Sequence, residues 1–201
     1  MQTTQDGPQA AKQNLRQRAR AARDAQPDRD RLSTRVLTNA LALPEAQQAQ
    51  TVLWYVSCGS EVATREALQA ALTESQRIII PYCTVDAAGS PCLGLWWLHS
   101  LSELEPGRWD IPEPPLARRD EPERTIAPVE LDLVLVPGVA FSPQGDRLGN
   151  GAGYYDRLLP RTRDDCLHIG IGFECQLFAD IPMDPHDRRL HGVATEQTVY
   201  R

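Results

Sequence analysis

The chain contains a single lysine, Lys12, among 21 basic residues, so arginine supplies almost all of its positive charge. Acidic residues outnumber basic ones and give a net charge of −6. Binding to nucleic acid needs cations that neutralise phosphates, so we expect no nucleic-acid partner. The one lysine is either an accident of an arginine-rich composition or a position where a compact ammonium suits better than a planar guanidinium.

Long apolar runs and paired cysteines are also missing. No stretch approaches the roughly 20 apolar residues of a membrane-spanning helix, and residues 1–24 lack the apolar segment of a secretory signal. An organelle transit peptide is the alternative for this arginine-rich start, but Asp6 and the absence of serine speak against it. Five cysteines without a C-x-x-C pair fit reduced thiols, not a disulfide framework or a zinc site. We expect a cytoplasmic protein without a membrane partner.

The 201 residues are enough for one domain with a buried core. We expect residues 12–201 to form that domain, as a monomer, and residues 1–11 to be a disordered tail. Aliphatic runs predict strands at 51–57, 77–81 (stopped by Pro81), 92–98, 131–137, 168–173 and 193–200. Helical patterns are expected at 9–24, from a cap at Asp30 to Leu41, at 61–72 after a cap at Ser60, and from Tyr154 onward.

The order of these segments predicts an α/β fold with a mostly parallel sheet, because strands alternate with helices along the chain. The near-continuous aliphatic run LDLVLVP (131–137) is typical of a strand that is covered on both faces. Residues 105–128 are rich in prolines and charges, which predicts an irregular loop over the surface.

The stretch GDRLGNGAGYYDR (145–157) follows that buried strand and precedes an expected helix. Open α/β sheets bind ligands at the carboxyl ends of their strands. Gly149, Gly151 and Gly153 can adopt positive φ, so backbone N–H groups can converge on an anion, and Arg147 adds a cation. Asp156 would lie in the first helical turn, where it can stabilise the helix or bind Mg²⁺ beside phosphates. We interpret the stretch as a phosphate cradle.

This glycine pattern differs from the two common phosphate-binding motifs. G-x-G-x-G is one residue shorter than the dinucleotide fingerprint, and the G-K-[ST] of the mononucleotide P-loop is missing. A glycine-rich turn that binds nothing is therefore the alternative interpretation.

The segment LVPGVAFSPQGDRLGNGAGYYDRLL (135–159) resembles the signature of the 5-formyltetrahydrofolate cyclo-ligase family, also called methenyltetrahydrofolate synthetases. Weaker similarities follow in the family's order, at Lys12 and Arg16, at 55–64, at 109–114 and at 183–187. The resemblance implies a three-layer α/β/α sandwich of the type shared with sugar-phosphate isomerases and CoA transferases. It also implies ATP- and Mg²⁺-dependent closure of 5-formyltetrahydrofolate to 5,10-methenyltetrahydrofolate, with release of ADP and phosphate.

The implied chemistry suits the residues present. The N5-formyl group is an amide, whose carbon is a poor electrophile and whose oxygen is a poor leaving group. Phosphorylation of that oxygen by ATP would correct both, after which N10 attacks the carbon and phosphate departs. Such a reaction needs two aligned substrates and stabilised phosphoryl charge more than a nucleophilic triad.

The resemblance assigns a role to individual positions. Arg147 and Asp156 would be catalytic, and Asp156 and Asp187 would bind the metal. Glu61 would bind the donor-rich edge of the pterin. Aromatic rings would sandwich the flat folate rings. The full ATP-binding set would be Lys12, Arg16, Arg147, Gly149, Asn150, Gly151, Ala152, Gly153, Tyr154 and Tyr155, and the substrate-binding set Ser57, Glu61, Tyr82, Trp109 and Tyr154.

Structural explanations compete with several of these roles. Lys12 and Arg16 lie four residues apart, so they share one helix face, which could be a solvated basic face together with Arg18, Arg20 and Arg23. Asp187 could belong to a surface turn, and the aromatic residues could be core.

The sequence also departs from the family's pattern. Asn150 stands where the family often has a basic or aromatic residue, Ala152 where it often has a glycine or lysine, and His191 where it often has a second late aspartate. These departures leave a non-catalytic nucleotide- or folate-binding relative as an alternative function. A sugar-phosphate isomerase-like enzyme that needs no ATP is a third.

Overall fold

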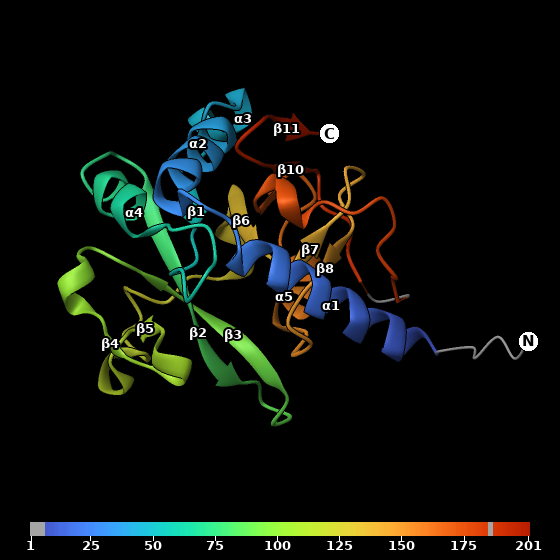
Figure 1. Ribbon diagram of the computed structural model, residues 1–201. Coiled ribbons are helices and arrows are strands. Elements are labelled where there is room, and N and C mark those ends of the chain that lie inside the picture. Colours follow the sequence, from blue (N-terminus) through green and yellow to red (C-terminus); the bar gives the residue numbers. More distant parts are fainter. Residues whose placement is uncertain (1–6, 185–186) are drawn as a thin grey trace, which may run out of the picture.

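A seven-stranded sheet forms the centre of the computed structural model, which describes residues 7–184 and 187–201 (Figure 1). The spatial order is β11-β10-β9-β6-β1-β2-β3, and only the two edge strands run antiparallel to their neighbours. The expected mostly parallel α/β sheet is confirmed. The strands are β1 (Thr51–Leu53), β2 (Arg77–Val85), β3 (Pro91–Trp97), β6 (Leu133–Pro137), β9 (Leu167–Ile171), β10 (Gly192–Ala194) and β11 (Val199–Tyr200).

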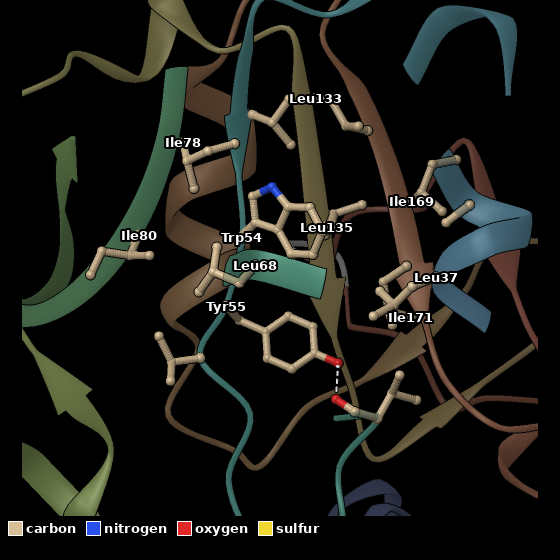
Figure 2. Packing of buried hydrophobic residues seen from close by; sticks show 14 of the residues in the cluster. Leu37, Trp54, Tyr55, Leu68, Ile78, Ile80, Leu133, Leu135, Ile169 and Ile171 are labelled. Atoms are coloured by element: carbon tan, nitrogen blue, oxygen red, sulfur yellow. Dashed lines mark hydrogen bonds between the residues drawn. The ribbon is translucent and has the colours of Figure 1, made fainter. Parts of the chain in front are cut away.

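Both faces of the sheet are buried, as the aliphatic strands predict. Successive strand residues point to opposite faces, so Leu133 and Leu135 enter one core while Val134 and Val136 enter the other. On the first face, Trp54 packs among the leucines of β6 and the isoleucines of β2 and β9 (Figure 2). The first core also contains side chains of helices α2 (Arg29–Leu41) and α4 (Arg65–Ala71), and the second contains side chains of α5 (Tyr154–Leu158).

Helix α1 (Pro8–Asp24) packs outside these two cores, against β7 (Ala140–Phe141) and the turn at 174–176 (Figure 1). Its Leu15 and Ala19 form a third apolar cluster with residues of the β7–β8 hairpin, where β8 is Arg147–Leu148. The helix begins earlier than expected, so residues 8–11 are helical and not a disordered tail. The remaining expected tail, residues 1–6, lies outside the described residues. Within the described ranges, no helix is long and apolar enough to cross a membrane.

Pro81 does not stop its strand. β2 continues to Val85, because β1 pairs with β2 only at residues 77–79 and the strand beyond has one free side. The amide of Cys83, two residues on, points to that side and donates to the Glu113 carboxylate (3.0 Å). The missing N–H of Pro81 therefore breaks no ladder hydrogen bond.

Other boundaries also differ from expectation. The run 51–57 pairs only as far as Leu53, and 193–200 forms two strands of a hairpin instead of one. Helix α2 begins after Asp28, so Asp30 lies in its first turn and is not its cap. Helix α4 begins after Thr64, so Ser60 is not its cap. The short helix α3 (Pro44–Gln48) and two small hairpins, β4 (Glu105–Pro106) with β5 (Pro112–Glu113) and β7 with β8, were not predicted.

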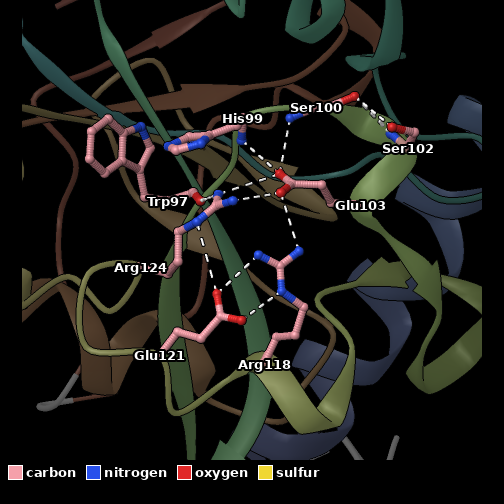
Figure 3. Close-up of polar contacts among 8 residues, drawn as sticks. All are labelled: Trp97, His99, Ser100, Ser102, Glu103, Arg118, Glu121 and Arg124. Atoms are coloured by element: carbon pink, nitrogen blue, oxygen red, sulfur yellow. Dashed lines mark hydrogen bonds and ion pairs between the residues drawn. The ribbon is translucent and has the colours of Figure 1, made fainter.

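An ion-pair network closes the base of the irregular segment 105–128 (Figure 3). The Glu103 carboxylate accepts hydrogen bonds from Arg124 (2.6 Å), Arg118 (3.2 Å) and the His99 and Ser100 amides. These bonds outweigh the effect of burial and lower the pKa of Glu103 to about 2. Both guanidinium groups also lie over the Trp96 ring. The two ends of the segment are thereby fixed to the core.

Candidate active site

The glycine loop (149–153) connects β8 to α5 at the carboxyl end of β6. Gly151 (φ 106°) and Gly153 (φ 68°) adopt the conformation that disfavours side chains. Gly149 serves a different need, since a Cβ there would lie 2.8 Å from the Arg147 guanidinium. Ala152 lies outside the positive-φ region, so its side chain costs the loop nothing. A Cβ at Gly153 would likewise lie 2.8 Å from the Arg157 guanidinium, so these two glycines let arginine side chains approach the loop backbone.

Arg147 is buried at the centre of the site, with 5% of its side chain exposed. Its Nη2 donates to the Asp156 carboxylate (2.6 Å), and its Nη1 donates to the Pro137 carbonyl at the end of β6 (3.4 Å). Its Nε has no hydrogen-bond partner among the described residues. A buried guanidinium with an unused donor is suited to binding an anion.

Two cavities adjoin at the glycine loop. The larger, about 210 Å³, lies toward α1 and brings together five predicted nucleotide or metal residues from outside the glycine loop. The smaller, about 100 Å³, lies toward the loop after β1. Arg147, Gly149, Gly153 and Asp156 line both. The larger is also lined by Gln9, Lys12, Arg16, Leu148, Gly151, Asp184 and Asp187, and the smaller by Glu61, Pro137, Gly138, Asn150, Ala152, Tyr154 and Tyr155.

Helix α1 contributes two predicted cations to the larger cavity. Lys12 is buried, and its ammonium donates to Asp184 (2.7 Å) and Asp187 (2.8 Å). These carboxylates raise the pKa of Lys12 although burial opposes them. The Arg16 Nε donates to the Gly149 carbonyl (2.9 Å), which ties α1 to the glycine loop. Lys12 and Arg16 thus share one face toward the site. Asp187 belongs to a turn, in which its carboxylate accepts from the Asp184 amide (2.7 Å), and it is also paired with Lys12.

The smaller cavity contains Glu61 and two tyrosines. Burial raises the pKa of Glu61. Burial likewise raises the pKa of Tyr155, whose hydroxyl has no hydrogen-bond partner among the described residues. Tyr154 accepts a hydrogen bond from Arg108 (3.1 Å). Tyr155, from the predicted ATP-binding set, lines this cavity together with Glu61, and so do Asn150 and Ala152 of the same set.

Three predicted substrate residues lie outside both cavities. Ser57 closes the loop after β1, where its amide donates to the Thr64 hydroxyl and its hydroxyl accepts from the Thr64 amide. Tyr82 is buried, with its hydroxyl donating to the Arg119 carbonyl (3.4 Å). Trp109 is 58% exposed in the segment 105–128, at a positive φ of 58°.

Sequence reasoning missed several contacts to the site. Arg20 donates to the Asn150 side chain (2.8 Å), and Arg157 donates to the Ala152 carbonyl (2.7 Å). Arginines outside the loop thus reach its two non-glycine positions. The four-residue spacing of Arg16 and Arg20 places both on one face of the helix and could have predicted the Arg20 contact. The same spacing, however, also fits a basic helix face exposed to solvent. His191 is exposed and lies away from both cavities; its Nδ1 accepts from the His168 amide (2.9 Å).

The carboxylates of the larger cavity can be tested against the expected Mg²⁺. In the part of the chain that the structure describes, no three His, Cys, Asp or Glu side chains form a complete metal site. Mg²⁺ commonly takes one or two carboxylates and completes its shell with water and phosphate oxygens. Asp156 and Asp187 line the same cavity. This donor set fits a Mg²⁺ ion that arrives with a nucleotide.

Comparison with known proteins agrees with this geometry. Residues 8–196 match the 5-formyltetrahydrofolate cyclo-ligase family. The chain is 31% identical to the 5-formyltetrahydrofolate cyclo-ligase of Mycolicibacterium smegmatis, over 83% of this chain and 93% of the relative. It is 30% identical to the enzyme of that name from Escherichia coli K12, over 92% of this chain and 98% of that relative. A solved structure of Aquifex aeolicus 5,10-methenyltetrahydrofolate synthetase superposes with a TM-score of 0.78 at 33% identity, covering 94% of this chain and 92% of that one.

Proposed function

The chain belongs to the 5-formyltetrahydrofolate cyclo-ligase family, and from this we propose that it converts 5-formyltetrahydrofolate to 5,10-methenyltetrahydrofolate with ATP as co-substrate. The observation that carries the proposal is the pair of adjoining cavities. They share Arg147, Gly149, Gly153 and Asp156, so a ligand in each would meet at these four residues. A two-substrate transfer reaction requires such a meeting point.

The larger cavity is suited to the triphosphate. Lys12, Arg16 and Arg147 supply three cations around it, and the three glycines of the loop supply backbone without side chains. Asp156 and Asp187 would hold Mg²⁺, which would neutralise phosphate charge when bound. Lys12 and Asp187 now pair with each other (2.8 Å), so phosphate and metal would each replace one member of that pair.

The smaller cavity is suited to the folate end that reacts. The Glu61 carboxylate can accept from the amino group and ring N–H of a pterin, and Tyr154 and Tyr155 offer aromatic faces. At the junction, the formyl oxygen would attack the γ-phosphorus and displace ADP. Attack by N10 on the activated carbon would then expel phosphate and release the N10 proton. Arg147 would stabilise charge on the transferred group.

The test is a spectrophotometric assay of purified protein with 5-formyltetrahydrofolate, Mg²⁺ and ATP, beside a reaction without ATP. We expect near-ultraviolet absorbance of the methenyl product only when ATP is present. Ligand binding without product would support a non-catalytic relative instead. Turnover of a sugar phosphate without ATP would support an isomerase-like enzyme.

A further inference from the structure

Helix α1 presents four cations on one face, which we call the basic stripe: Lys12, Arg16, Arg20 and Arg23. Their spacings of four, four and three residues keep them on one side of a helix. Lys12 and Arg16 line the larger cavity, and Arg20 contacts Asn150 of the glycine loop. The fourth member, Arg23, extends beyond that loop and reaches a different part of the site.

Arg23 contacts the turn that carries Glu61. Its Nε donates to the Ser60 hydroxyl (3.0 Å), and that hydroxyl donates in turn to the Asp24 carboxylate. Within the turn, the Cys58 amide donates to the Glu61 carboxylate (3.0 Å) and the Glu61 amide donates to the Cys58 carbonyl (3.2 Å). The last turn of α1 is therefore hydrogen-bonded to the turn at 58–61, at the residue next to Glu61.

The charge of Arg23 favours the ionised form of the Glu61 carboxylate. Burial raises its pKa, whereas the Cys58 amide and the Arg23 guanidinium lower it. The other ionisable groups around it are the tyrosines Tyr55 and Tyr155 and, across the small cavity, Arg147 and Asp156. Arg147 is already paired with Asp156 (2.6 Å), and among the described residues Arg23 is the cation whose charge lowers the pKa of Glu61.

We propose that Arg23 is a positioning residue for the folate: it holds the turn at 58–61 so that the Glu61 carboxylate faces the small cavity as an anion. This inference rests on the proposed function, because it presumes that Glu61 receives the pterin. Arg23 itself does not contact the substrate. The basic stripe then serves both substrates, with its first members at the nucleotide and its last at the folate.

Kinetics of variants can test this role. In Arg23→Ala we expect the KM for 5-formyltetrahydrofolate to rise about tenfold, because a hydrogen bond to a charged group and its charge are lost. The KM for ATP should stay within about twofold. Arg23→Lys keeps the charge and should recover most of the loss. The matched control is Arg18→Ala, which removes the same charge from α1 at a residue that contacts only the Phe178 ring among the described partners.

The inference further predicts dependence on Glu61. In a Glu61→Gln background, Arg23→Ala should add less than about threefold to the folate KM, since residues that act together are not additive. A full tenfold effect in that background, an unchanged folate KM in Arg23→Ala, or an equal rise in Arg18→Ala would each overturn the role. If the parent protein forms no methenyl product, the proposed function fails, and equilibrium binding of 5-formyltetrahydrofolate to the same variants still decides the role of Arg23.

Discussion

At the scale of single residues, the Arg147–Asp156 pair connects the two cavities. Arg147 is buried and Asp156 largely so, with 5% and 18% of their side chains exposed. Two opposite charges in that setting are each dependent on the other, because removing one leaves the other buried and uncompensated. Asp156 therefore has two roles: it neutralises the buried Arg147 guanidinium, and it is the proposed ligand of Mg²⁺.

We predict that Asp156→Ala lowers kcat by about a hundredfold or more, through misplaced metal and a disordered Arg147. It should also lower the free energy of unfolding by about 3 kcal/mol. Steady-state kinetics with a Mg²⁺ titration, and urea denaturation, measure the two effects. Asp180→Ala, at an exposed aspartate, is the control and should change neither. Loss of stability with an unchanged Mg²⁺ dependence would contradict the metal role.

His168 gives the stability of the protein a defined pH dependence. It is buried beside His191, and burial lowers its pKa to about 4. Between about pH 4 and the ordinary histidine pKa near 6.5, the unfolded chain binds a proton there that the folded chain does not, so stability rises with pH. We predict a shallower rise over this window in His168→Gln than in the parent, measured by urea denaturation. His99→Gln, at an exposed histidine, should keep the parent's slope.

At the scale of elements, the sheet was predictable and its partners were less so. Aliphatic runs such as 131–137 announce buried strands, because both faces of a parallel sheet are covered. The extension of β2 through Pro81 was not predictable, since it depends on where β1 stops pairing. The residue types of α1 revealed a basic face, but only tertiary structure decides that Arg20 and Arg23 contact the site while Arg18 does not. The sequence predicted an irregular loop around Trp109, but neither the small β4–β5 hairpin there nor the positive φ of Trp109 could be predicted from it.

Helix α1 also provides a prediction of its own. Lys12→Ala should raise the KM for ATP by about tenfold and leave the KM for folate nearly unchanged, because Lys12 lines only the larger cavity. Initial-rate kinetics with each substrate varied in turn measure this split. If the folate KM rises instead, the assignment of the larger cavity to ATP is wrong.

At the scale of the whole molecule, the site is a junction of distant segments. The glycine loop and its neighbours Arg147 and Asp156 could be predicted because they are contiguous in sequence. The pairing of Lys12 with Asp184 could not, since these residues lie 172 positions apart. We propose that residues 12–201 form a single domain, since α1 is hydrogen-bonded to both the glycine loop and the turn at 58–61.

That arrangement predicts strong stabilisation by ligands. A ligand that binds only the folded state at one hundred times its Kd should add about 2.7 kcal/mol to the free energy of unfolding. We therefore expect Mg-ATP to raise the melting temperature, and the tenfold weaker binding in Lys12→Ala to reduce that rise by about half at the same ATP concentration. Differential scanning fluorimetry gives the comparison, with AMP as the control that lacks the β- and γ-phosphates. Equal shifts with AMP and ATP would argue against a triphosphate cradle.

The bonds of α1 also order events during synthesis. The ribosome makes this helix before every strand of the sheet. The hydrogen-bond partners of Arg16 and Lys12, however, are residues 149, 184 and 187, which are made much later. A nascent chain arrested before the glycine loop would carry Lys12, Arg16 and Arg20 without the partners that they contact in the folded protein. Contacts at such sequence separation form late, because the intervening chain must first be closed into a loop. The larger cavity is therefore complete only after residues 184 and 187 have been made.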